Sequence, residues 1–208
     1  MHAEPGLLLV DLGGVFFDYD FGRAITSWAD AAGVDPALLQ SRFHLDEVFM
    51  AFERGAISPS HYLAHLRRTL RAQLTNAQLA AGWNSIWGTV NHDLVALLHR
   101  LDRRVLLPVG ASNTNLLHAG QWRRTFRDDL PVLAEVYCSY KIGTTKPEPG
   151  FFDHIAAAHH VSRSALVLLD DQPAIIAAAT ALGIRAHHYR TPAAAEAYLH
   201  HLAALPSH

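Results

Sequence analysis

The chain contains 208 residues, of which 50% are hydrophobic and 17% are charged, and its formal net charge at pH 7 is −2. These values indicate a globular protein with a buried core and argue against a disordered chain. The 17 basic residues are scattered rather than clustered, so we expect no nucleic-acid partner and no binding to an anionic membrane.

The cysteine content and the N-terminal residues bear on the cellular compartment. Cys138 is the single cysteine and cannot form a disulfide within the chain, which fits a reducing cytoplasm. The apolar run 7–10 has no basic region before it, and no apolar stretch approaches ~20 residues. We therefore expect a cytoplasmic protein, and we expect it to be a monomer or a weak homodimer.

Short apolar runs that end in polar residues predict the strands of the fold. They cover residues 7–10, 105–109, 135–138 and 165–169. Helical patterns follow the later runs, at residues 116–126, 151–159 and 174–182. Because strands alternate with helices, we predict an α/β fold with a doubly wound, Rossmann-like parallel sheet.

The long stretch 21–100, between the first two predicted strands, shows no convincing strand pattern and is predicted to be entirely helical. Helix starts are indicated by Asp35-Pro36, Ser58-Pro59, Thr75 and Asn91. We therefore expect two domains: an α/β core formed by residues 1–20 and 101–208, and a small helical cap, 21–100, inserted after the first strand.

Acidic residues stand where the first and last predicted strands end. Asp11 follows the run 7–10, and Asp170-Asp171 follow the run 165–169. The carboxyl ends of parallel strands share one edge of a sheet, where ligands bind, so we expect these side chains to converge. Three carboxylates would repel one another, which makes a hard cation such as Mg²⁺ their natural partner.

Other polar residues at the same edge suit a phosphate group. Ser112 follows the run 105–109, and Lys146 follows a later loop. Ser112 and Asn113 also open a helix, whose first backbone amides favour an anion. Strand-end Ser and Asp residues are often turn residues or helix caps, but the whole set in this order is more specific.

Four motifs carry a resemblance to a known family. They are Val10-Asp11-Leu12-Gly13-Gly14-Val15, Ser112, Lys146-Pro147-Glu148-Pro149 and Leu168-Leu169-Asp170-Asp171. In this order they resemble the motifs of the haloacid dehalogenase-like hydrolase superfamily. Phe43-His44 and Glu53-Arg54-Gly55 are similar to cap signatures of its bacterial glucose-1-phosphate phosphatase-like branch.

The resemblance implies a magnesium-dependent phosphatase that acts on a small phosphorylated metabolite, similar to a sugar phosphate. It makes Asp11 the nucleophile, which forms an aspartyl-phosphate, and makes Asp170 and Asp171 metal ligands together with Asp11 and the backbone carbonyl of Gly13. It also implies that Ser112, Asn113 and Lys146 hold the phosphate, and that Ser112 and Lys146 take part in catalysis.

Gly13 departs from the family pattern. Most phosphatases of the family have a second Asp there, which protonates the departing alcohol and then activates water. Without it, substrates with good leaving groups are favoured, unless another group replaces the acid. Asp18, Asp20 and the cap residue His44 are candidates, although Asp18 and Asp20 also suit a turn and a helix cap before Phe21.

Glu53 and Arg54 in the cap are further candidates for contact with the substrate or for proton transfer. They could bind substrate hydroxyls, and the alternative is a solvated pair on a helix.

Other classes of protein share part of this pattern. Phospho-accepting receivers place their acidic pair at the first strand, whereas Asp170-Asp171 come last here. Dehalogenases do not need the full acidic metal site. An inactive relative that binds a phosphorylated ligand or a partner protein without turnover stays open, because Gly13 has no side chain for proton transfer.

Overall fold

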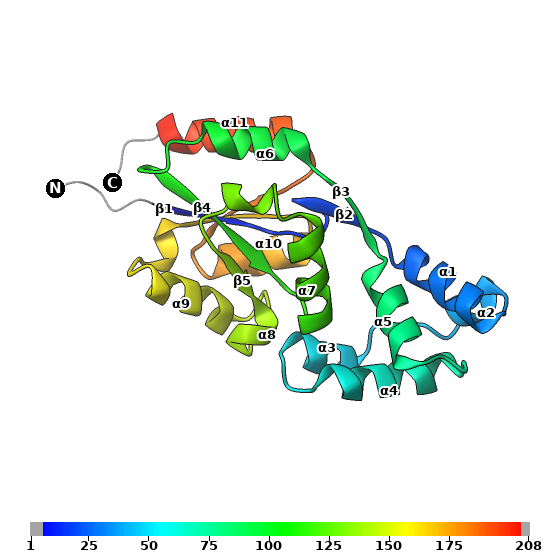
Figure 1. Ribbon diagram of the computed structural model, residues 1–208. Coiled ribbons are helices and arrows are strands. Elements are labelled where there is room, and N and C mark those ends of the chain that lie inside the picture. Colours follow the sequence, from blue (N-terminus) through cyan, green and yellow to red (C-terminus); the bar gives the residue numbers. More distant parts are fainter. Residues whose placement is uncertain (1–5, 205–208) are drawn as a thin grey trace.

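The computed structural model describes residues 6–204, which contain a five-stranded parallel sheet flanked by helices (Figure 1). The strand order is β5-β4-β1-β6-β7, and each neighbouring pair is parallel. The strands are β1 (Gly6–Val10), β4 (Leu106–Ser112), β5 (Val136–Cys138), β6 (Leu166–Asp170) and β7 (Arg185–His188). The predicted doubly wound α/β fold is confirmed.

Both faces of the sheet are covered by helices, and β1 contributes to both layers. Leu8 and Val10 belong to one apolar cluster, while Leu7 and Leu9 point to the opposite face and belong to another. The first face holds α6 (His92–Arg100), α7 (Leu116–Thr125) and α11 (Pro192–Ala204), and the second holds α9 (Pro149–Ala158) and α10 (Pro173–Ala181). No helix within residues 6–204 is long and apolar enough to cross a membrane.

Three short elements complete the core. They are α8 (Ser139–Ile142), which directly follows β5, and the 3₁₀ turns Leu130–Val132 and Arg163–Ala165. Figure 1 shows α6 and α11 on one side of the sheet and α9 on the other, with α8 beside the end of α9.

An antiparallel ribbon, β2 (Phe17–Tyr19) with β3 (Trp87–Val90), carries the chain from the core into the helical insert and back. Phe17 packs edge-on against Trp87, with ring centroids 5.1 Å apart. The prediction that residues 21–100 are entirely helical is therefore wrong at β3. Each strand is too short to show an alternating pattern by itself, and its partner lies beyond the whole insert.

The helices between these two strands pack into a cap with its own core. They are α1 (Phe21–Ala32), α2 (Pro36–Gln40), α3 (Glu47–Glu53), α4 (Pro59–Leu70) and α5 (Asn76–Asn84). Trp83 is fully buried in this cap and stacks on Trp28, with centroids 6.3 Å apart. The helix starts predicted at Asp35, Ser58 and Thr75 are confirmed, because each side chain accepts a first-turn backbone N–H.

The predicted cap range 21–100 also includes α6, which packs with the core. Leu94, Leu97 and Leu98 are buried in the cluster on the first face of the sheet, and α6 contacts α11. We therefore propose that the cap ends near Ile86, and that α6 belongs to the core.

Gly82 provides a test of packing in the cap. It lies inside α5, and a methyl group there would overlap the indole of Trp28, whose Nε1 donates to the Leu79 carbonyl at 3.0 Å. Replacing a helical Gly by Ala ordinarily stabilises by about 0.5–1 kcal/mol. We expect Gly82→Ala instead to lower the free energy of unfolding by about 1–3 kcal/mol, measured by urea denaturation.

Gly120→Ala is the matched control. Gly120 lies inside α7, and the nearest atom to an added methyl group is the Arg124 Nη1, 3.7 Å away. This variant is expected to be more stable than the parent by about 0.5–1 kcal/mol. Equal stabilisation by both substitutions would show that the indole of Trp28 does not fill the space beside Gly82.

Candidate active site

Carboxylates from two neighbouring strands meet at the carboxyl edge of the sheet. Asp11 directly follows β1, Asp170 is the last residue of β6, and Asp171 comes next. One oxygen from each carboxylate lies within 4.8 Å of the other two. Asp11 and Asp170 are buried and Asp171 is partly buried. The fold thus brings together acidic residues that are about 160 positions apart in sequence.

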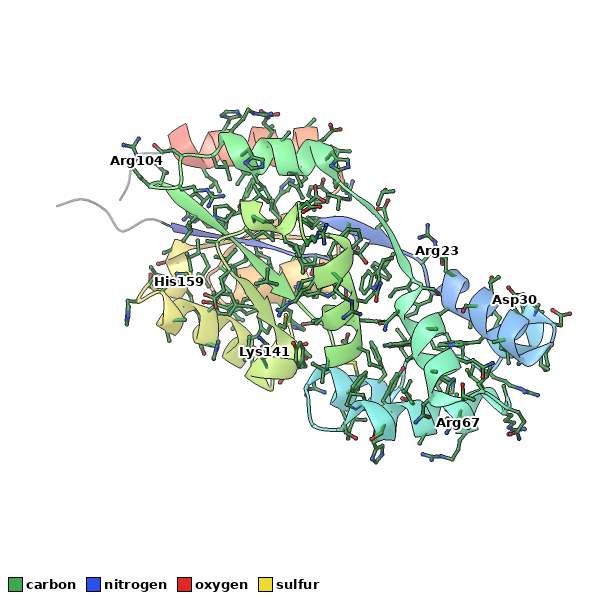
Figure 2. The ribbon with its side chains drawn as sticks, viewed as in Figure 1. Arg23, Asp30, Arg67, Arg104, Lys141 and His159 are labelled. Carbon is green, nitrogen blue, oxygen red and sulfur yellow. The ribbon has the colours of Figure 1, made fainter. Side chains whose placement is uncertain are left out.

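Lys146 lies between two of these carboxylates. Its Nζ donates to Asp11 Oδ1 at 2.8 Å and to Asp170 Oδ2 at 2.6 Å, and its side chain is almost completely buried. The other lysine of the chain, Lys141, is exposed on α8 (Figure 2). A buried ammonium group with two carboxylate partners is a fixed positive charge at the sheet edge.

Burial shapes the protonation of these groups. It raises the pKa of Asp11 to about 7, an effect that Lys146 opposes and Asp170 reinforces. It also raises the pKa of Asp171, again with a contribution from Asp170. Burial alone would lower the pKa of Lys146, but Asp11 and Asp170 raise it above its ordinary value. Lys146 therefore stays charged, while burial and repulsion between the carboxylates make Asp11 and Asp171 harder to ionise than isolated carboxyl groups.

The donor set fits a divalent cation. Asp11, Asp170 and Asp171 outnumber the ammonium group of Lys146, and Asp171 Oδ1 is buried with no hydrogen-bond partner among residues 6–204. Closely spaced carboxylate oxygens are ligands that Mg²⁺ prefers. Gly13 lines the same cavity, so its backbone carbonyl is a further candidate ligand.

Asn113 holds Lys146 in place through its side chain. Asn113 Oδ1 accepts from the Lys146 backbone N–H at 2.8 Å, and its Nδ2 donates to the Lys146 carbonyl at 2.8 Å. The contact of Asn113 with phosphate stays a prediction, and with its side chain bonded to Lys146 it would involve the Asn113 backbone N–H. Ser112, at the end of β4, lines the cavity, and its hydroxyl makes only a long contact of 3.4 Å with the Asn113 carbonyl.

A cavity of about 380 Å³ lies between this sheet edge and the cap. The core side contributes the polar groups of Asp11, Ser112 and Lys146. The cap side is largely apolar and includes Leu45, Phe49, Met50 and Glu53. The cavity is large enough for a small molecule whose charged end faces the sheet.

Comparisons with known proteins agree with this geometry. No family model matches the chain. It is 26% identical over 170 residues to a D-ribitol-5-phosphate phosphatase of Bacteroides thetaiotaomicron, over 79% of this chain and 82% of that protein. A crystal structure of a wild-type HAD (haloacid dehalogenase) family enzyme from the same organism, in complex with magnesium and inorganic phosphate, is 25% identical. The match covers 89% of this chain and 94% of the chain of that enzyme, with a TM-score of 0.75.

In sequence and in fold, the chain is similar to members of the haloacid dehalogenase-like superfamily. A predicted HAD-like family hydrolase from Porphyromonas gingivalis shares the fold, with a TM-score of 0.76 at 21% identity, over 95% of this chain and 98% of that chain. The placement of Asp11, Ser112, Lys146 and Asp170 at adjacent points of one sheet edge matches the order of motifs by which the sequence resembles this superfamily.

Three residues predicted as acid–base candidates do not reach the cavity at the sheet edge. Within the described chain, none of His44, Asp18 and Asp20 lines the cavity. The His44 side chain is 64% exposed, and Asp18 accepts a long hydrogen bond from Thr89 at 3.4 Å. Asp20 caps α1 by accepting the Gly22 N–H at 2.7 Å, so its alternative role as a helix cap is confirmed.

Glu53 and Arg54, predicted as a pair, have separate surroundings. Glu53 is 8% exposed and lines the cavity, and burial followed by the charge of Asp11 raises its pKa to about 7. Arg54 instead donates from Nη2 to Glu148 Oε1 at 2.7 Å and from Nε at 3.2 Å. Arg54 does not line the cavity within the described chain, and its pair with Glu148 joins the cap to the core.

Tyr19 and His118 line the cavity although the sequence patterns did not single them out. The ring of Tyr19 lies 3.2 Å from the position of a Cβ at Gly13, so it fills the space beside that residue. His118 donates from Nε2 to the Trp83 carbonyl, and burial lowers its pKa to about 3, which keeps it neutral. Tyr19 lies in β2, a strand that the sequence pattern does not predict. For His118, the sequence signal is its spacing of three residues from Asn115, whose Nδ2 contacts His118 Nδ1.

The buried Glu53 predicts a pH-dependent stability. Its pKa in the folded chain, about 7, lies above its ordinary value of 4.5. The stability that protonated Glu53 contributes is thus fully present below pH 4.5 and is lost as the pH rises through about 7. In the presence of a chelator, the parent should lose stability relative to Glu53→Gln as the pH rises from 5 to 8. We expect the difference between their free energies of unfolding to change by on the order of 2–3 kcal/mol over this range.

Glu47→Gln is the control for that measurement, because Glu47 is exposed on the same helix α3. Denaturant unfolding of the three proteins at both pH values gives the comparison. A difference between Glu53→Gln and the parent that does not change with pH would show that Glu53 is solvated in both protonation states.

Proposed function

We propose that this chain is a magnesium-dependent phosphatase that hydrolyses a small phosphorylated metabolite through an aspartyl-phosphate on Asp11. The observation that carries this proposal is the position of Asp11 at the base of the cavity, in contact with Lys146 and close to Asp170 and Asp171. The similarity to the D-ribitol-5-phosphate phosphatase and to the magnesium and phosphate complex supports the same activity.

Each residue of the sheet edge has a role in this reaction. An Asp11 carboxylate oxygen attacks phosphorus, and the bond from phosphorus to the alcohol oxygen breaks. Lys146, fixed by Asn113, offsets negative charge on the phosphate and on Asp11, while the Ser112 hydroxyl and the Asn113 backbone N–H bind phosphate oxygens. When bound, Mg²⁺ would supply the charge screening that allows a carboxylate to approach a phosphate dianion.

The cavity supports a small substrate similar to a sugar phosphate. Its volume of about 380 Å³ is sufficient for a sugar-sized group attached to a phosphate. Gly13 has no side chain that can protonate the departing oxygen, and the Tyr19 ring lies beside it. Good leaving groups are therefore favoured wherever the rest of the cavity does not supply a proton.

Asp11→Asn tests the nucleophile. The amide cannot attack phosphorus, so hydrolysis of p-nitrophenyl phosphate with Mg²⁺ should fall on the order of 10³-fold or more, while the folded chain remains. The assay measures kcat/KM, with thermal unfolding as the check on folding. The parent should lose activity in a chelator and recover it when Mg²⁺ is added.

Asp153→Asn is the matched control, because Asp153 is exposed on α9, where it pairs with Arg163 at 2.6 Å. This variant should keep the activity of the parent. Undiminished hydrolysis by Asp11→Asn would remove Asp11 as the nucleophile.

A further inference from the structure

An alkyl phosphate needs a proton donor near its departing oxygen, since an alkoxide is a poor leaving group. General acids typically accelerate such steps about 10²–10⁴-fold. Among the described residues that line the cavity, the titratable ones are Asp11, Tyr19, Glu53, His118 and Lys146. Asp11 is the nucleophile of the proposed reaction, and Lys146 is bonded to two carboxylates. Both ring nitrogens of His118 have partners, on Trp83 and Asn115.

Glu53 and Tyr19 are left, and no hydrogen bond involves either side chain among residues 6–204. Tyr19 is 41% exposed, and partial burial followed by the charge of Asp171 raises its pKa above the ordinary value of 10. Glu53 is therefore the stronger acid of the two. It is buried against the cavity, yet no hydrogen bond or ion pair involves its carboxylate among residues 6–204. Its carboxylate oxygens are not among the fully buried polar atoms that lack a partner, so they are accessible from the cavity, where a ligand would supply a partner. Glu53 enters the cavity from the end of α3 in the cap, whereas Asp11 and Lys146 enter from the core.

The segment Glu53-Arg54-Gly55, called here the docking segment, fixes this position. The Glu53 carbonyl accepts from Ser139 Oγ at 2.7 Å, and Arg54 pairs with Glu148. Gly55 has φ of 68° and lies so close to the Tyr140 carbonyl that no Cβ would fit. Figure 1 shows the resulting contact of α3 with α8. Each residue of the docking segment thus holds the end of α3 against the core.

The charges around Glu53 suit a group that both donates and accepts a proton. Burial, and then the charge of Asp11, raises its pKa to about 7, while Lys146 and Arg54 oppose the shift. Tyr19 and Tyr62 are the other titratable groups whose surroundings include Glu53. Near neutral pH, both protonation states of Glu53 are accessible.

We propose that Glu53 is the catalytic acid and base of this phosphatase, brought to the substrate by docking of the cap. The inference rests on the proposed function. In the first half, Asp11 bonds to phosphorus, the bond to the alcohol oxygen breaks, and that oxygen takes the proton of Glu53. In the second, the Glu53 carboxylate takes a proton from water, whose oxygen attacks phosphorus, and the bond to Asp11 breaks to release phosphate and restore both carboxyl groups.

The test measures kcat/KM with Mg²⁺ for dinitrophenyl, nitrophenyl, phenyl and alkyl phosphates. The proteins are the parent, Glu53→Gln, Glu53→Asp, Tyr19→Phe and the exposed control Glu47→Gln. We expect Glu53→Gln to lose about 10²–10⁴-fold on phenyl and alkyl phosphates and far less on dinitrophenyl phosphate, which needs no acid. Glu53→Asp should recover part of the loss, and Glu47→Gln should match the parent.

A rapid-mixing experiment examines the second half. With dinitrophenyl phosphate, Glu53→Gln should release a burst of dinitrophenolate equal to the enzyme concentration and then turn over slowly, because water lacks its base. Unchanged dependence on the leaving group in Glu53→Gln, or a steeper dependence in Tyr19→Phe instead, would overturn the role of Glu53. A parent that hydrolyses none of these esters with Mg²⁺ would overturn the proposed function itself.

Discussion

The buried contact of Lys146 with Asp11 and Asp170 is the constraint on which the site depends. It joins the ends of two adjacent strands to a loop that follows α8, and Asn113 bonds that loop to the end of β4. Buried ion pairs contribute little net stability, since desolvation offsets their attraction, but loss of one partner costs about 3–5 kcal/mol. The arrangement is therefore better explained by the fixed charge it presents to a ligand than by stability.

The two sides of the cavity divide the chemistry between core and cap. The sheet edge contributes charged groups whose positions follow from strand pairing, so they are rigid relative to one another. The cap contributes apolar side chains and Glu53, whose position depends on the ribbon β2-β3 and on the docking segment. Attraction between a phosphate and the sheet edge is strengthened when the apolar cap side excludes water.

The sequence predicts those features that depend on local pattern or on topology alone. Strands β1, β4 and β6 are apolar runs buried on both faces, and their polar ends Asp11, Ser112 and Asp170 must share one edge. Strand β7 escapes prediction because its residues, 185–188, are polar and half-exposed at the edge of the sheet. Sequence proximity and residue type favour His44, Asp18 and Asp20 as proton donors, whereas access to the cavity depends on how the cap docks.

The docking segment contributes little to the attachment of the cap, which α5 also joins to α7 through the His118–Trp83 hydrogen bond. The Arg54–Glu148 pair is more than a third exposed, which limits it to about 1 kcal/mol, and the Ser139 hydrogen bond adds about 1 kcal/mol. The charge of Asp11 also raises the pKa of Glu53, so ionisation of both carboxyl groups opposes the docked arrangement of the cap. A ligand that neutralises the charge of the sheet edge and bonds to Glu53 removes the repulsion between the two carboxylates, and it can make both contacts only when the cap is docked. Ligand binding and cap docking must therefore favour each other, because a ligand shifts an equilibrium toward the state it binds more tightly.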